Sequence, residues 1–340
     1  MRIGQVADTI KMVYDNPKTR NRALFLMGPS GIGKSDCVAQ AVKKLSLPER
    51  PMSIYDLRLS TSDPTDFGLL MPENGTLVRQ KPAFIAHMEE HPDGILFLDE
   101  LTSAPPAVQA PAYQLVLDRQ VNGFPVPPGW MVVGAGNRQS DRGVTFNIAA
   151  PLLNRMTLIE VDTVLDDVLE YGAINGLSPL VMAFLKSRGD LLHKFDGATH
   201  SGAQFPSPRG WFAVGNKLDL PVPDGLRVEL IKGDIGHEAA VLFEQFMRVW
   251  ETMPSIDAIF EDPDSVEVPE KLDVRYCVSM GVSARLDKDN FEKAWRYMLR
   301  LPKEFQVLIV KLAYQRDPAI AQSPVFASWV EANSDAFKRS

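Results

Sequence analysis

The chain has 340 residues, of which 45% are hydrophobic, and its formal net charge is −7. This length and composition are ordinary for a folded protein of two or more domains. The acidic balance disfavours a protein that coats nucleic acid by charge alone. The two cysteines, Cys37 and Cys277, give neither a disulfide framework nor the spacing of a zinc site.

The opening stretch, MRIGQVADTIKMVYDN, lacks the basic start and continuous apolar run of a signal peptide. Nowhere in the chain do uncharged apolar residues run long enough to span a membrane. We therefore predict a cytoplasmic protein that makes no contact with membranes.

A glycine-rich loop is the first informative motif. Residues 28–35, GPSGIGKS, fit the pattern G-x-x-x-x-G-K-[S/T], between a predicted buried strand (ALFLMG) and a predicted helix (KSDCVAQAVKKL). Such a loop turns its backbone N–H groups toward phosphate oxygens at the N-terminus of the helix. The predicted nucleotide-binding residues are Gly28, Pro29, Ser30, Gly31, Ile32, Gly33, Lys34 and Ser35.

Lys34 and Ser35 give this loop its chemistry. Lys34 would reach the β- and γ-phosphates of ATP, and the Ser35 hydroxyl would bind Mg²⁺, a hard cation that prefers oxygen. The alternatives are a chance glycine turn and a dinucleotide-binding loop. The spacing does not suit the second, in which a Lys-Ser pair has no role.

A second motif, GILFLDE at 94–100, supplies carboxylates after an apolar run. Ile95 to Leu98 predict a buried parallel strand that carries Asp99 to its carboxyl end. Asp99 would hold Mg²⁺ and Glu100 would polarise the attacking water. Taken alone, such a pair is often a solvated strand end.

Three further polar residues follow predicted elements. Asn137 ends the apolar run GWMVVGAGN, where its amide would hold water or a γ-phosphate oxygen, although a loop asparagine often satisfies only its own turn. Arg155 precedes another apolar run, and Arg209 begins a helix after Pro208. A guanidinium from a neighbouring subunit can raise turnover by roughly 10³–10⁵. Most single arginines are solvated or pair with a carboxylate.

The ordered set of motifs resembles the AAA+ ATPases, and within them the MoxR-like group. The resemblance covers about residues 1–255 and includes STSDPTDFGLL (60–70), DELTSAPPAVQAPAYQLVLDRQV (99–121) and SPR (207–209). It implies Walker A at 28–35, Walker B at Asp99 and Glu100, sensor 1 at Asn137, an arginine finger at Arg155 and sensor 2 at Arg209.

Two departures bear on the finger. Arg138 stands where the family usually has proline, and LLNRM replaces the common LDRF, so Arg142 and Arg119 are alternatives to Arg155. Because the finger of this family acts in trans, the resemblance implies a homo-oligomeric ring, most often a hexamer. It also implies a chaperone-like action on a protein client, for which a protein with a von Willebrand factor A domain is a candidate.

The expected fold class is α/β, a P-loop NTPase core with a parallel sheet flanked by helices, then an all-α lid and a helical C-terminal extension. We predict strands near 24–27, 52–57, 95–98, 131–135 and 157–161, and hairpins within 60–84 and 118–130. The predicted domains are 1–162 for nucleotide binding, 163–258 for the lid, 259–273 for a linker and 274–340 for the extension.

These observations favour an Mg-dependent ATPase that forms a ring and remodels or activates a partner protein. One alternative is an AAA+ motor directed at nucleic acid, against which the acidic charge and the lack of mixed aromatic and basic runs both count. Another is a slow nucleotide-gated binding switch, which the intact Asp99-Glu100 pair disfavours.

Overall fold

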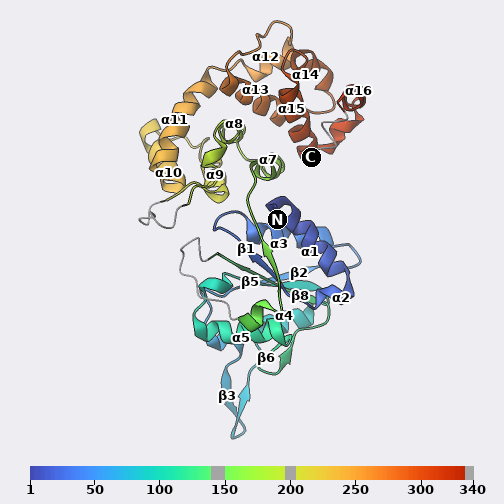
Figure 1. Ribbon diagram of the computed structural model, residues 1–340, viewed down its shortest axis with the longest axis vertical. Coiled ribbons are helices and arrows are strands. Elements are labelled where there is room, and N and C mark those ends of the chain that lie inside the picture. The colour runs from blue at the N-terminus through green and yellow to red at the C-terminus, as the bar shows by residue number, and fades with distance from the viewer. Residues whose placement is uncertain (139–149, 196–203, 334–340) are drawn as a thin grey trace. The chain divides into compact units, whose positions relative to one another are not determined.

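The computed structural model describes residues 1–138, 150–195 and 204–333, which belong to two compact units (Figure 1). The first unit runs from Met1 to Thr163 and the second begins at Val164. The first is an α/β unit, and the described part of the second is helical. None of the helices in the described ranges has the length and apolar character needed to cross a membrane.

A five-stranded parallel sheet in the order β2-β5-β8-β1-β9 forms the centre of the first unit. The inner strands β1, β5 and β8 follow apolar runs that are buried on both faces, as parallel strands usually are, whereas the edge strands β2 and β9 are partly exposed. Each lies within one or two residues of the predicted range: β1 (Leu24–Met27), β2 (Ser53–Arg58), β5 (Gly94–Asp99), β8 (Trp130–Gly136) and β9 (Thr157–Glu160).

Successive side chains of these strands point to opposite faces, so the sheet has two cores. Leu24, Leu26 and Phe97 lie in one core with the helices α1 and α3, and Phe25 and Leu98 lie in the other with α4 and α5. Figure 1 shows these helix pairs on opposite sides of the sheet. The helices of this unit are α1 (Val6–Asp15), α2 (Pro17–Arg20), α3 (Lys34–Leu45), α4 (Ala83–Glu90), α5 (Pro106–Leu117) and α6 (Ala150–Leu153), with 3₁₀ turns at Ile3–Gln5, Pro64–Phe67 and Leu101–Ser103.

Two antiparallel hairpins fall where the sequence predicts them. The strands β3 (Leu70–Glu73) and β4 (Thr76–Arg79) form the first, and β6 (Gln120–Val121) and β7 (Phe124–Pro125) form the second. The β3–β4 hairpin projects away from the sheet at the bottom of Figure 1. Leu70, Met71, Leu77 and Val78 on it are exposed.

The second unit contains ten helices in its described part. They are α7 (Leu165–Ile174), α8 (Pro179–Ser187), α9 (Pro208–Gly215), α10 (Asp224–Ile235), α11 (His237–Glu251), α12 (Ile256–Glu261), α13 (Leu272–Arg285), α14 (Phe291–Met298), α15 (Lys303–Arg316) and α16 (Pro324–Ala332), with 3₁₀ turns at Gly189–Leu191 and Pro318–Gln322.

The predicted separation of lid and C-terminal extension does not divide this unit. Cys277 and Met280 of α13 and Leu312 of α15 pack in the same core as Phe184 and Trp211 of the predicted lid. Helix α13 also packs directly on α8. Because these side chains share one buried cluster, residues 164–333 form a single compact unit in their described part.

The stretch predicted as a linker, 259–273, connects α12 to α13. Helix α12 continues to Glu261, and the chain from there to α13 is bonded to neighbouring helices. Arg300 Nη2 donates to the carbonyl oxygen of Val266 at 2.9 Å, and Arg275 Nε donates to that of Pro269 at 2.7 Å. The proline and acidic content of this stretch reflects an irregular backbone packed on the helices.

Candidate nucleotide site

The phosphate-binding loop leaves the carboxyl end of β1 and enters α3, as its sequence predicts. Gly28 passes so close to β9 that a Cβ there would lie 2.5 Å from the carbonyl oxygen of Val161. Gly33 has a φ of 95°, in the left-handed region that favours glycine, immediately before the helix. The fixed glycines of the motif thus meet local steric demands.

Lys34 is held inside this loop. Its side chain is only 9% exposed, and Nζ donates to the carbonyl oxygens of Gly28 and Pro29 at 2.7 and 2.8 Å. It also donates to Asn137 Oδ1 at 3.1 Å. The ammonium group is therefore placed at the mouth of the loop and beside the end of β8.

Ser35 and Asp99 come together from α3 and β5. Ser35 Oγ donates to Asp99 Oδ2 at 3.0 Å, and Asp99 is only 7% exposed. The other carboxylate oxygen, Oδ1, accepts the backbone N–H of Glu100 at 2.8 Å. The two oxygen donors expected to hold Mg²⁺ are adjacent.

Glu100 follows with an unusual backbone. Its φ of 55° and ψ of 33° lie in the left-handed region, which costs a residue with a side chain roughly 1–2 kcal/mol. Its carboxylate Oε2 accepts a hydrogen bond from Oγ of Ser60, which lies just beyond β2. Ser60 was not predicted, since an isolated serine in a polar stretch carries no signal in the sequence.

The pKa of Asp56 on β2 is affected by the carboxylates at this edge of the sheet. Asp56 reaches the surface, but its partial burial raises the pKa of its carboxyl group. The nearby Asp99 and Glu100 carboxylates raise this pKa further. Burial is the larger cause, and the Arg58 charge acts in the opposite direction.

Asn137 is fixed from two sides at the end of β8. Its backbone N–H donates to Thr102 Oγ1 at 3.0 Å, and its side-chain oxygen accepts from Lys34. Thr102, which follows Glu100 in a 3₁₀ turn, also escaped prediction. The carboxyl ends of β1, β5 and β8 thus bring together two hydrogen-bonded pairs, Lys34 with Asn137 and Ser35 with Asp99.

The donor set suits magnesium better than a transition metal. A serine hydroxyl and one carboxylate are hard oxygen ligands, and Mg²⁺ in nucleotide sites takes its remaining ligands from phosphates and water. Within the described ranges, no three or more His, Cys, Asp or Glu side chains are grouped to hold a metal ion without such help.

The sequence of this unit matches a known domain family. Residues 23–156 match the AAA domain (dynein-related subfamily), and this segment contains the loop, Asp99, Glu100, Asn137 and Arg155. Residues 23–156 are therefore similar to an AAA domain, which supports an AAA+ ATPase. The MoxR-like group is a finer assignment that this match does not make.

The whole chain was also compared with curated proteins and with solved structures. No curated protein matches the chain. The solved structures similar to it include a putative ATPase from Cytophaga hutchinsonii, with 13% identity, 92% of this chain and 80% of that chain covered, and a TM-score of 0.38. A RuvB mutant from Thermotoga maritima has 17% identity, 86% of each chain covered and a TM-score of 0.38. NtrX from Brucella abortus in complex with ADP has 17% identity, 95% and 64% covered, and a TM-score of 0.39.

Arg155 lies in the turn between α6 and β9 and takes no part in the hydrogen bonds between Lys34 and Asn137 or between Ser35 and Asp99. It is exposed, and its guanidinium makes no hydrogen bond or ion pair with any residue that the structure describes. An arginine in this condition is available to another molecule.

The alternatives to Arg155 differ in this respect. Arg119 donates to the backbone carbonyls of Pro127 and Trp130 in its own unit, and burial together with the Arg20 charge lowers its pKa. Arg138, which is not a candidate finger but stands where the family usually has proline, forms an ion pair with Asp162 at 2.6 Å. Arg142 lies outside the described residues. Arg155 and Arg119 can therefore be compared, and only the Arg155 guanidinium is left to contact another molecule.

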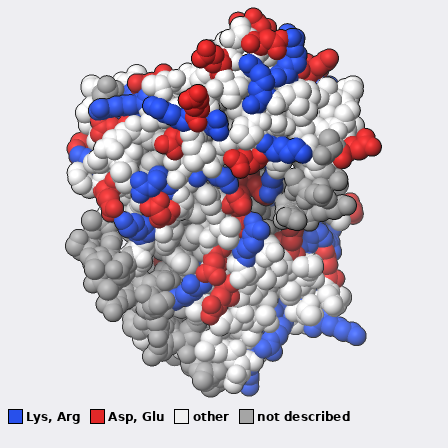
Figure 2. All heavy atoms as spheres, turned by 45° about the horizontal axis from the view of Figure 1, so that its top comes forward, with Lys and Arg blue, Asp and Glu red and all other residues white. Residues whose placement is uncertain are grey.

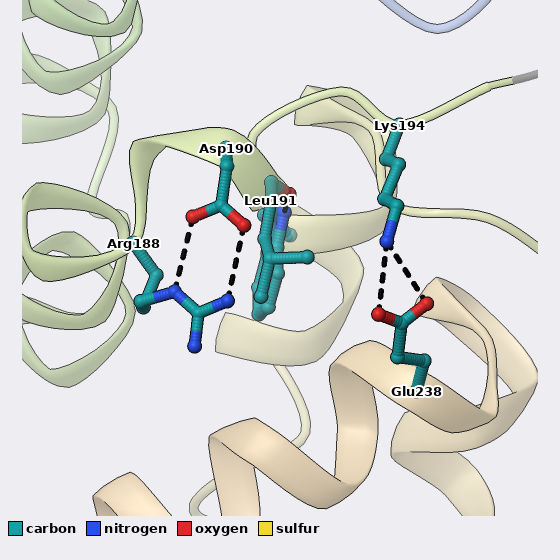
Figure 3. A network of polar contacts seen from close by, with 6 residues as sticks. Arg188, Asp190, Leu191, Lys194 and Glu238 are labelled. Carbon is teal, nitrogen blue, oxygen red and sulfur yellow. Dashed lines mark hydrogen bonds and ion pairs between the residues drawn. The ribbon is translucent and has the colours of Figure 1, made fainter.

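Arg209 belongs to the second unit, in the first turn of α9. Ser207 Oγ caps this helix by accepting the N–H of Gly210, and Trp211 Nε1 donates to the carbonyl oxygen of Leu191 at 2.8 Å. Two ion pairs lie beside Leu191, Arg188 with Asp190 and Lys194 with Glu238 (Figure 3). The bonds of Gly210 and Trp211 fix the start of α9 within the second unit.

Arg209 itself is exposed and makes no side-chain contact of this kind with the described residues. A cation in the first turn of a helix opposes the helix dipole. Arg209 has no compensating partner within the described part of the unit.

Proposed function

We propose that this protein is a magnesium-dependent ATPase of the MoxR-like AAA+ group. It would assemble into a ring, most often a hexamer in the group it resembles, and couple hydrolysis of ATP to remodelling or activation of a partner protein. The observation that carries the nucleotide chemistry is the contact of Ser35 Oγ with Asp99 Oδ2 beside the buried Lys34.

Each of the site residues has a role in hydrolysis. Lys34 would exchange its carbonyl partners for oxygens of the β- and γ-phosphates, and Asn137 would orient the γ-phosphate or the attacking water. Bound through Ser35 and Asp99, magnesium would neutralise charge on the phosphates. Glu100 would accept a proton from the water as its oxygen bonds to the γ-phosphorus and the bond to ADP breaks.

The exposure of Arg155 supports the proposal that the protein forms a ring. A guanidinium that is exposed and has no partner among the described residues can reach a γ-phosphate held by a neighbouring subunit. The neighbouring side chains Leu153 and Leu158 are also exposed, which suits an edge that another subunit covers. The protein client, and a von Willebrand factor A domain as its type, rest on the resemblance to the MoxR-like group.

The test measures ATP hydrolysis against protein concentration, with light scattering, for the wild type and Arg155→Ala. We expect specific activity to rise as particles grow, and to fall by 10³-fold or more in Arg155→Ala while ATP binding persists. Arg248→Ala, which removes an exposed arginine of the second unit, serves as the matched control and should stay near wild type. Hydrolysis that is independent of both concentration and Arg155 would contradict the ring.

The client class is tested in the same assay. Figure 2 shows Lys and Arg interspersed with Asp and Glu on the face drawn, a pattern that offers no continuous basic track there. We expect duplex and single-stranded DNA at physiological salt to leave the rate unchanged. Strong stimulation by either would favour a motor directed at nucleic acid, and very slow turnover with nucleotide-dependent partner affinity would favour a binding switch.

A further inference from the structure

Arg22 makes three hydrogen bonds to the segment that carries Arg155. It lies between α2 and β1, and its Nη2 donates to the carbonyl oxygens of Asn154 and Met156 at 3.0 and 2.9 Å. Its Nε donates to Thr157 Oγ1 at 3.1 Å. The two carbonyls belong to the residues on either side of Arg155.

The turn around Arg155 is held from two directions. On the inner side, Met156 is 3% exposed in the core under the sheet, and the N–H of Thr157 donates to the carbonyl oxygen of Ala23 at 2.9 Å. On the outer side, Asn154 and Arg155 are exposed, and Arg22 bonds the backbone there. Arg155 itself is left with its side chain free among the described residues.

The chemistry of the guanidinium suits this task. Its planar fork donates in fixed directions and retains its charge, so it can hold two carbonyls at a set separation. The carbonyls it holds determine the orientation of the peptide groups that flank Arg155, and therefore the direction in which the Arg155 side chain leaves the backbone.

We propose that Arg22 is a positioning residue that aims Arg155 at the nucleotide of the neighbouring subunit. The inference rests on the proposed function, since it requires Arg155 to act in trans. Arg22 does not touch the nucleotide site of its own subunit. Its loss should therefore impair a subunit as a donor of the finger and leave that subunit's own Lys34, Ser35, Asp99 and Glu100 able to hydrolyse ATP.

Mixed rings separate these two capacities. A Glu100→Gln subunit cannot hydrolyse ATP but keeps Arg22 and Arg155, whereas an Arg155→Ala subunit keeps its own site but donates no finger. Mixing these two full-length variants should restore a measurable share of wild-type turnover at interfaces where the first donates to the second. This pair tests the trans arrangement without involving Arg22.

Arg22→Ala is then mixed with each of them. Alone, we expect about 10-fold to 10²-fold slower hydrolysis, the size of loss that a small misplacement of a catalytic group can cause. Mixed with Glu100→Gln it should recover activity, and mixed with Arg155→Ala it should not. A subunit that had simply lost its fold would fail in both mixtures, so the pattern distinguishes positioning from structural damage.

Arg20→Ala is the matched control. Arg20 precedes Arg22 by two residues, but it donates to the carbonyl oxygen of Tyr14 at 2.8 Å and stacks on the Tyr14 ring, away from Arg155. We expect Arg20→Ala to hydrolyse ATP near the wild-type rate and to donate normally to Arg155→Ala.

Each other result overturns a definite statement. Wild-type turnover in Arg22→Ala alone, recovery when it is mixed with Arg155→Ala, or failure to recover with Glu100→Gln when the reference pair succeeds would each overturn the role of Arg22. Failure of the reference pair itself would overturn the trans action of Arg155, and with it the proposed ring, before Arg22 is considered.

Discussion

Ser35 Oγ lies 3.0 Å from Asp99 Oδ2, which joins the first turn of α3 to the carboxyl end of β5. Both oxygen atoms are potential ligands of a metal ion. The Asp99 carboxylate also accepts a second hydrogen bond, from the backbone N–H of Glu100. The orientation of the Asp99 carboxylate is therefore set by the protein before any ligand arrives, which reduces the reorganisation needed to hold a cation.

The first prediction concerns this pair. Asp99→Asn should lower Mg-dependent hydrolysis by about 10³-fold or more, because the carboxylate that holds the cation against the phosphates is lost. Titration of the rate with MgCl₂ measures it. Asp36→Asn removes the same charge from the exposed residue next to Ser35 and should leave the titration unchanged. Equal losses in the two variants would contradict the assignment.

The second prediction concerns Glu100. Glu100→Gln should retain ATP binding and slow hydrolysis by about 10²–10⁴-fold, the usual contribution of a general base. Binding is measured by fluorescent nucleotide titration and hydrolysis by phosphate release. The amide can still accept from Ser60, so the local structure should persist. Wild-type turnover in Glu100→Gln would refute the role given to this carboxylate.

The sheet and the core of the site could be predicted because their signals are local. The run Ile95 to Leu98 is buried on both faces, and parallel strands bring residues at their carboxyl ends to one edge. The position of Asp99 and Asn137 after apolar runs therefore predicts that both lie at this edge of the sheet. The hairpins within 60–84 and 118–130 followed from glycines and prolines that break the apolar pattern.

What could not be predicted depends on contacts between distant segments. Nothing around Arg22 marks it, and its contacts arise only because β1 and β9 are neighbours in the sheet. The left-handed backbone of Glu100 has no signature in a residue that usually avoids it. The lid and the extension look separate because a proline-rich stretch divides them, whereas Cys277 and Met280 bury themselves among lid side chains.

The third prediction uses this shared core. Burial raises the pKa of the Cys277 thiol to about 12, from an ordinary value near 9, and the nearby Asp273 raises it in the same direction. Between these values the unfolded chain releases the proton and the folded chain keeps it, so the free energy of unfolding should fall as pH rises from about 9 to about 12.

Urea unfolding at several pH values between 9 and 12 measures this fall. The burial itself is measured by alkylation of Cys277 at pH 8 in a Cys37→Ala background, where it is the sole thiol. Because the thiolate is the reactive form and the residue is buried, labelling of the native protein should be far slower than in urea. If α13 were a detached extension, labelling would be fast without denaturant, and this outcome would contradict a common core for the second unit.

The fourth prediction concerns Arg209 and separates function from stability. Arg209 opposes the dipole of α9 and has no partner among the described residues, so Arg209→Ala should leave the free energy of unfolding unchanged or raise it by about 0.3–1 kcal/mol. Hydrolysis should nevertheless fall, since the resemblance to the MoxR-like group implies that Arg209 is the sensor 2 residue, which would act on the bound nucleotide. Urea unfolding and phosphate release are measured on the same samples.

Lys194→Ala, which breaks the pair with Glu238 near the same helix, is the control and should keep its turnover. A destabilised Arg209→Ala with normal turnover would make Arg209 a structural residue of the second unit and remove it from the nucleotide site.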